Sequence, residues 1–315
     1  MLTFRLKIAF CFVFGIGTLI TLYAIANGKD LFSSSLNPNA FTEMGRQRAR
    51  EYFIEQGAET GSDEAVFGYA WATFTLGDYD GAEEACDHLL ASDSLSKDIR
   101  AGCLYLRAHV YLNRSQFNLA RQNFIACSDL YGPGSVGKLR SQLGMVRIHI
   151  LTEEYDKAFF WLEQSKPGKD DPLNVIGYWW VLKKQYHFFS ENDYESALEA
   201  ALWAAEYYKE SGNRSAYAAQ LTSTGMFRML LSDWVGGTFD VNYSKGILLG
   251  AKDHHELAYN AGPWYFRARC YEGISTFERE QAEADFQNAT ERAEETGDQH
   301  LARLLNFAKV CPCPY

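Results

Sequence analysis

Cysteines are the residues of this sequence whose chemistry is easiest to delimit. Apart from Cys11 there are six of them, and an even number permits disulfides in a chain that is exported to an oxidising compartment. These six are Cys86, Cys103, Cys127, Cys270, Cys311 and Cys313. The last two belong to a terminal Cys-Pro-Cys-Pro-Tyr sequence, which could be a redox tail, a tethering tail or a frayed end.

Two short motifs resemble catalytic or metal sites but lack a necessary residue. Residues 132–138 match G-x-x-x-x-G-K, yet Leu139 follows where a phosphate loop needs Ser or Thr for magnesium. His255-Glu256 would begin a helical zinc motif, but Tyr259 stands at the position of the second histidine. The sequence therefore predicts no catalytic residue, no metal site and no cofactor.

Charge and composition exclude several classes of protein. The 315 residues include 30 basic and 40 acidic ones, giving a formal net charge of −10, and 47% of the residues are hydrophobic. This composition is typical of a globular chain and not of a disordered one. An acidic surface does not suit the phosphate backbone of nucleic acids, so we expect no nucleic-acid partner.

The N-terminus carries a long apolar segment. Arg5 and Lys7 come first, and residues 8–26 then contain no charge. Nineteen helical residues span about 28 Å, which is close to the thickness of a bilayer core. Ala24-Ile25-Ala26 also fits a cleavage site, so residues 1–30 are either a signal peptide or a transmembrane anchor. In both cases the remainder of the chain should lie outside the cytoplasm, because the basic residues stay inside. We expect an extracytoplasmic, periplasmic domain that is either membrane-anchored or secreted to the periplasm.

A repeat of about 38 residues follows. Its mark is an aromatic residue three positions before a small one, between two segments with helical apolar periodicity. The small residues of the four clearest copies are Ala82, Ala120, Ala158 and Ala197, spaced by 38, 38 and 39 residues. Weaker copies follow at Trp234 and around Ala282. Breaker-rich loops separate the units, so each unit reads as helix, short turn, helix and longer loop.

The segment LGDYDGAEEACDHLL at 76–90 resembles the second half of a tetratricopeptide repeat (TPR). The resemblance implies an all-α fold, a TPR-like α-solenoid of stacked helical hairpins with terminal capping helices, preceded by one N-terminal hydrophobic helix. The expected organisation is a targeting or anchoring segment at 1–30, a linker and N-terminal capping helix at 31–62, about six hairpins at 63–295, and a C-terminal capping helix with the Cys-Pro tail at 296–315.

Hairpin geometry restricts the pairing of three cysteines. Cys86 and Cys103 lie at equal distances in sequence from the loop after the first repeat. Cys103 and Cys127 lie at equal distances in sequence from the turn of the second repeat. Cys103 could therefore face either of them in a disulfide. The alternative is that all three are buried thiols that pack as small apolar residues.

The TPR resemblance implies that the first helix of each repeat lines a groove in which partners bind. Aromatic residues and arginine, which are enriched at binding hot spots, occupy many of these positions. The predicted partner-binding residues are Phe67, Trp71, Phe74, Tyr105, His109, Arg140, Arg147, Trp179, Tyr186, Trp264, Arg267 and Tyr271. Arg140 and Arg147 lie two helical turns apart on one side and would suit an acidic peptide.

The expected function is that of a non-enzymatic scaffold or accessory subunit. It would bind a protein or peptide partner, with subunits of a membrane complex among the candidates, and contact the membrane through residues 8–26. One alternative is an all-helical carbohydrate-active enzyme, which needs two carboxylates facing each other across a cleft. Another is a periplasmic chaperone or redox factor that uses the C-terminal cysteines.

Overall fold

The part of the chain that the structure describes is all-helical. In the computed structural model the described residues are 50–55, 57, 61–250, 254–296, 299–311 and 313–314, and no strand occurs among them. The predicted N-terminal hydrophobic helix lies outside these residues, as does most of the predicted N-terminal capping helix. None of the described helices is long and apolar enough to cross a bilayer.

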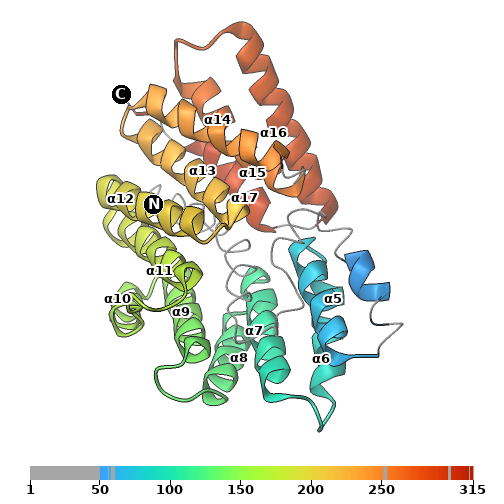
Figure 1. Cartoon of the computed structure of the whole chain (residues 1–315). Coiled ribbons are helices and arrows are strands. Elements are labelled where there is room, and N and C mark those ends of the chain that lie inside the picture. The colour runs from blue at the N-terminus through green and yellow to red at the C-terminus, as the bar shows by residue number, and fades with distance from the viewer. Residues whose placement is uncertain are drawn as a thin grey trace. The chain divides into compact units, whose positions relative to one another are not determined.

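Six successive helix pairs and one further helix follow a short helical segment at 50–55 (Figure 1). The helices are α5 (Asp63–Thr75), α6 (Tyr79–Leu90), α7 (Lys97–Asn113), α8 (Phe117–Asp129), α9 (Val136–Leu151), α10 (Tyr155–Gln164), α11 (Leu173–Tyr186), the π-helical turn η1 (His187–Glu191), α12 (Tyr194–Glu210), α13 (Arg214–Leu230), α14 (Trp234–Gly250), α15 (His254–Cys270), α16 (Thr276–Thr296) and α17 (Gln299–Val310).

The turn inside each of the first five pairs has the same backbone conformation. The repeat aromatic is the first residue of the second helix, and the residue two positions before it has a positive φ. A positive φ reverses the chain within two residues, and only glycine adopts it without steric cost. These residues are Gly77, Ser115, Glu153, Asn192 and Ser232, with φ between 53° and 86°.

Side-chain caps set the starts of the helices. In three of the turns an aspartate precedes the repeat aromatic and accepts a backbone hydrogen bond three residues on, as Asp193 does from Ser196 N at 2.9 Å. At the loops between pairs, Ser96 accepts from Ile99 N at 3.3 Å and Asn213 from Ala216 N at 3.1 Å. The sequence breaks therefore lie where capping residues satisfy the first N–H groups of a helix.

Small residues allow the helices to pack closely. Ala82, Ala120, Ala158 and Ala197, the residues that mark the repeat, are all fully buried. A Cβ on Gly144 of α9 would lie 2.5 Å from the ring of Phe124 on α8, so that position accepts only glycine.

The described chain divides into two compact units, one ending at Val175 and the other beginning at Ile176. In the first unit, α5 contacts α6 and α7, and each later helix up to α10 contacts the one before it. In the second unit, the contacts run in chain order from α12 to α16, and α17 packs against both α15 and α16. Each unit thus buries its apolar faces between successive helices, as stacked hairpins do.

Candidate functional site

Most of the predicted partner-binding residues are buried. Tyr186, Trp264 and Tyr271 are partly exposed. The buried ones are Phe67, Trp71, Phe74, Tyr105, His109, Arg140, Arg147, Trp179 and Arg267. The first helices therefore present few large side chains directly to solvent, and the polar members of the set become the informative ones.

The aromatic residues of the first repeat pack between helices. The ring of Phe67 lies over Gly102 of α7, where an added Cβ would come within 2.4 Å of it. Trp71 meets Phe67 and Phe74 edge to face, at centroid distances of 6.2 and 5.9 Å. These contacts account for the three aromatics as core residues of the first unit.

A polar cluster lies where α7 meets α8 and α9. Nη1 of Arg147 donates to Nδ1 of His109 at 3.4 Å. The imidazole is held by two rings in edge-to-face contact, Tyr105 at 4.6 Å and Phe124 at 5.0 Å between centroids. His109 is fully buried and Arg147 is only 5% exposed.

The protonation state of His109 follows from these contacts. Burial, and then the positive charge of Arg147, hold the pKa of His109 well below its usual 6.5. Because arginine can only donate, Nδ1 of His109 must accept, and the ring proton is then on Nε2. No hydrogen-bond partner for that Nε2 occurs in the part of the chain that the structure describes.

Arg140, two turns earlier on α9, lies near a different side chain. Burial raises the pKa of the Cys127 thiol on α8 to about 11, although a hydrogen bond with Ser141 and the charge of Arg140 act in the opposite direction. Cys127 Sγ donates to the carbonyl of Ala101 at 3.3 Å. The structure thus places the two predicted arginines on the same helix, each against its own neighbours.

In the second unit, α11 carries a buried lysine that the sequence analysis did not single out. Lys184 Nζ donates to Oε1 of Gln220 at 2.7 Å and to Oγ of Ser223 at 3.2 Å, both on α13. Burial holds the pKa of Lys184 well below its usual value. The run Trp-Trp-Val-Leu-Lys-Lys-Gln-Tyr, with polar residues inside an apolar stretch, was the available signal.

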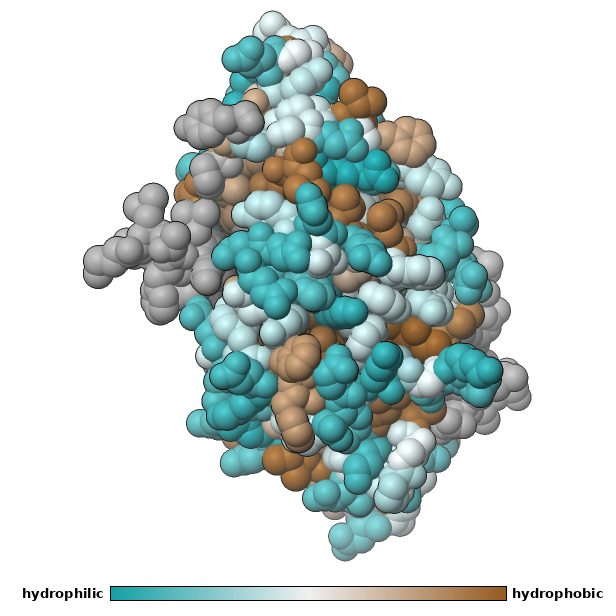
Figure 2. Space-filling model, turned by 90° about the vertical axis from the view of Figure 1, so that its left-hand side faces the viewer, coloured by the Kyte–Doolittle hydropathy of each residue, from teal (hydrophilic) through white to brown (hydrophobic). Residues whose placement is uncertain are grey.

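A surface aromatic cluster on α11 and α12 was also missed. Trp180 stacks on Trp203 at 5.9 Å, and Lys183 Nζ lies 4.8 Å from the ring centre of Trp180. Trp203 is 46% exposed. On the face drawn in Figure 2, hydrophobic residues form separate patches among hydrophilic ones.

The predicted residues Trp264 and Arg267 on α15, and Tyr271 directly after it, form one cation–π group. The guanidinium of Arg267 lies 5.4 Å from the ring of Trp264 and 5.2 Å from that of Tyr271. Arg267 also pairs with Glu278 of α16 at 3.5 Å. Trp264 lines a cavity of about 510 Å³ between α14, α15 and α16, in which Lys245 and Asp285 form an ion pair at 3.0 Å.

The thiols of the first unit form no disulfide. Cys86 and Cys103 are in hydrogen-bonding contact between α6 and α7, and this contact together with burial raises the pKa of Cys86 well above its usual value. Cys127 is likewise a buried, unbridged thiol. The structure therefore has the buried thiols that were the alternative to a disulfide, and it pairs Cys103 with Cys86 in space, one of its two expected neighbours.

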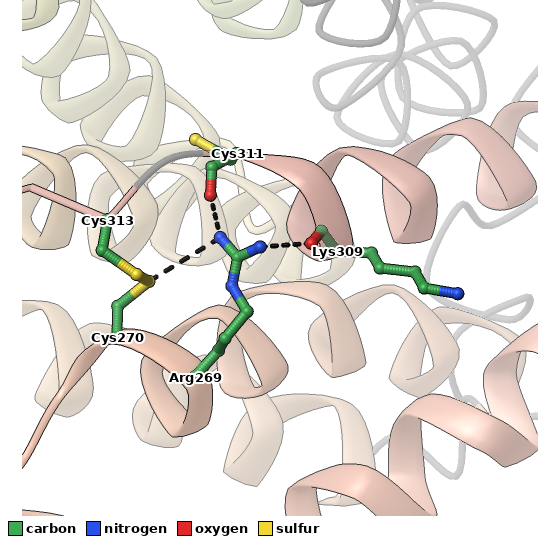
Figure 3. The surroundings of a disulfide bond; sticks show 5 residues. All are labelled: Arg269, Cys270, Lys309, Cys311 and Cys313. Carbon is green, nitrogen blue, oxygen red and sulfur yellow. Dashed lines mark hydrogen bonds between the residues drawn. A yellow bond between two sulfur atoms is a disulfide. The ribbon is translucent and has the colours of Figure 1, made fainter.

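A disulfide forms instead at the C-terminus (Figure 3). Cys270, the last residue of α15, is bonded to Cys313, with a Cα–Cα distance of 5.2 Å and a sequence separation of 43. Arg269 adds hydrogen bonds to the carbonyls of Lys309 and Cys311. The tail is thus tethered to α15, a pairing that hairpin symmetry about the repeat turns could not indicate.

Comparisons with known proteins bear on the fold. No protein-family model matches the chain, and no curated protein matches it. Among solved structures, it is similar to a Rap protein in complex with competence and sporulation factor, with a TM-score of 0.59, 12% sequence identity, and 98% of each chain covered. Together with the repeat geometry described above, this similarity shows that the chain has a TPR-like helical repeat fold.

Proposed function

We propose that this chain is a non-enzymatic scaffold that binds a protein or peptide partner through its helical repeats. The observation that carries the proposal is the structural similarity over 98% of both chains to a Rap protein that was solved with a bound factor. Stacked helical hairpins form extended surfaces of the kind that recognise peptides. Such a scaffold could act as an accessory subunit of a membrane complex, as expected from the sequence.

We further propose that the repeats lie on the extracytoplasmic side of a membrane. The basic residues before the apolar segment favour this orientation. The Cys270–Cys313 disulfide supports it, because such bonds persist in oxidising compartments and are rare in the cytosol. Protease added to spheroplasts should digest the repeats, and digestion only after lysis would reject this location.

The two alternatives receive less support. The carboxylates of Asp285 and Glu291 line the cavity, but both come from α16, and Asp285 is paired with Lys245. A redox factor needs a reactive thiolate, whereas burial raises the pKa of Cys311 to about 12. Cys313, the other cysteine of the tail, is already bonded to Cys270.

A site-specific photo-crosslinking experiment tests the scaffold proposal. The photoreactive residue would replace Tyr186 or Tyr271, which are partly exposed positions on first helices or their ends, in the full-length protein in detergent-solubilised membranes. Val235 on the second helix α14, 81% exposed, is the matched control. We expect a cross-linked partner from the first two positions and none from Val235. Cross-linking from Val235 alone, or from no position, would contradict the proposal.

A further inference from the structure

Arg147 has no carboxylate partner among the described residues, whereas three other arginines of the first unit have one. Arg107 on α7 pairs with Asp87 at 2.9 Å, and Arg114, the residue after α7, pairs with Asp80 and Glu83. Arg121 on α8 pairs with Glu154 at 3.5 Å. These three arginines are also more exposed than Arg147. The only polar contact of Arg147 among the residues that the structure describes is the one with His109.

A buried guanidinium without an anion is energetically unfavourable. Arginine cannot escape the cost by releasing its proton, as a buried lysine can. The effective penalty for an unpaired ion in a protein interior is several kcal/mol. A fold that retains such a group at 5% exposure therefore has an incomplete ionic site.

The local geometry orients the guanidinium for a ligand. His109 accepts one of its five N–H donors, and the ring of His109 is fixed between Tyr105 and Phe124. His109 stays neutral here because burial and Arg147 hold its pKa well below 6.5. It thus positions Arg147 without competing for an anion, and the remaining donors keep the fork arrangement that matches a carboxylate.

We propose that Arg147 anchors a carboxylate subsite, with His109 as a positioning residue. The occupant is a carboxylate of a peptide partner, from an Asp or Glu side chain or from the peptide C-terminus. A carboxylate fits better than a phosphate monoester, because one guanidinium balances one negative charge and the phosphate carries between about −1.5 and −2. This inference rests on the proposed scaffold function and adds the chemistry of the ligand.

Peptide binding to the full-length protein in detergent tests the subsite. The probe is an array of synthetic octapeptides in which each Asp or Glu peptide has an Asn or Gln twin, and each free C-terminus has an amidated twin. Charge-assisted hydrogen bonds contribute about 1.5–3 kcal/mol, so wild-type protein should lose roughly tenfold or more in affinity for one class of twin. The class that loses affinity identifies the carboxylate as a side chain or a C-terminus.

Two variants assign this preference to Arg147. Arg147→Gln should bind acid and amide twins equally, whereas Arg147→Lys should keep part of the preference because the charge remains. Arg107→Gln is the matched control, since Arg107 is neutralised by Asp87, and it should keep the full preference. The acid-to-amide comparison with wild-type protein needs no variant, so a folding defect in Arg147→Gln leaves the subsite testable.

Each outcome has a separate meaning. Peptides that bind wild-type protein without any dependence on a carboxylate would overturn the subsite and leave the scaffold proposal intact. A preference that survives in Arg147→Gln would overturn the assignment to Arg147, and displacement by millimolar inorganic phosphate would overturn the carboxylate class. Failure of the whole array to bind would overturn the scaffold proposal as a peptide-binding function, and the subsite with it.

Discussion

The two units of this protein each bury a cationic side chain, and they accommodate it differently. Lys184 of the second unit donates to the neutral groups of Gln220 and Ser223, and its depressed pKa favours the uncharged amine. Among the described residues, the polar contact of Arg147 in the first unit is with neutral His109 alone, and a guanidinium stays charged at any physiological pH. A buried lysine can release its proton and an arginine cannot, and no anion lies beside Arg147 among the described residues.

The same contrast appears in the covalent chemistry. The first unit has three buried thiols that are not bridged, and the second has the Cys270–Cys313 bond. The second unit thus has a covalent bond between two of its segments, and the first has none among its described residues.

The largest expected effect on stability concerns the Cys270–Cys313 disulfide. Replacing Cys270 and Cys313 together by Ser should destabilise the protein by about 4 kcal/mol, because the bond closes a loop of about 43 residues. Urea unfolding with and without reductant measures it. Reductant should lower the stability of the wild-type protein by the same amount and leave the double variant unchanged. A wild-type protein insensitive to reductant would show that the bond contributes nothing to folding.

Replacing each of the two buried cations by methionine should change the stability of the protein in opposite directions. Lys184→Met leaves the buried acceptors of Gln220 and Ser223 without a donor, and should cost about 1–3 kcal/mol. Arg147→Met removes an uncompensated buried charge, and in the absence of ligand should be neutral or stabilise by about 1–4 kcal/mol. Thermal unfolding at pH 7 measures both variants. Equal losses of stability would contradict the claim that the two buried cations are accommodated differently.

The pH dependence of stability should report on His109. Its folded-state pKa lies below the unfolded value near 6.5, so below that pH the unfolded chain binds a proton that the folded chain does not. Stability should then fall with decreasing pH by up to about 1.4 kcal/mol per unit, until the folded-state pKa is reached. His109→Asn keeps an acceptor for Arg147 but cannot be protonated, so this slope should disappear. An unchanged slope would assign it to other groups, such as His149, whose pKa burial also lowers.

Local pattern explains which parts of the fold could be predicted from sequence. Gly77, Asn192 and the aromatic-to-alanine spacing act within a few residues, so the TPR-like hairpins follow from the chain directly. The site depends on contacts between helices. Phe67 and Arg147 both lie on the first helix of a repeat. Phe67 packs over Gly102, whereas Arg147 contacts His109, 38 residues away in sequence. Each residue turns a helix by about 100°, so a shift of one residue moves a side chain from the core to the groove. Sequence periodicity alone does not determine the helix orientation to that precision.

The cysteines show the same limit. Hairpin symmetry left Cys86 and Cys127 as the two neighbours open to Cys103, and in the structure Cys103 is in hydrogen-bonding contact with Cys86. The partner of Cys313 depends on where α17 and the tail cross α15, which no local pattern encodes. Arg269 adds two hydrogen bonds from its side chain to tail carbonyls, and in sequence it is simply one more basic residue at a helix end.

The smallest expected effect concerns the turns, which the two units share. Ser115 and Glu153 of the first unit and Ser232 of the second adopt positive φ values of 58°, 60° and 66°, a conformation that costs L-residues about 1–2 kcal/mol. Glycine relieves this strain but loses more conformational entropy on folding, so each change to Gly should stabilise by only about 0.5–1 kcal/mol. Asn192→Gly should be close to neutral, because asparagine tolerates this conformation. Gly77→Ala is the reverse control: a Cβ there would meet no atom within 4 Å, so any loss would come from the backbone alone. Urea unfolding of the five variants measures the series, and equal values for Ser115→Gly and Asn192→Gly would contradict the claim that the serine turn is strained.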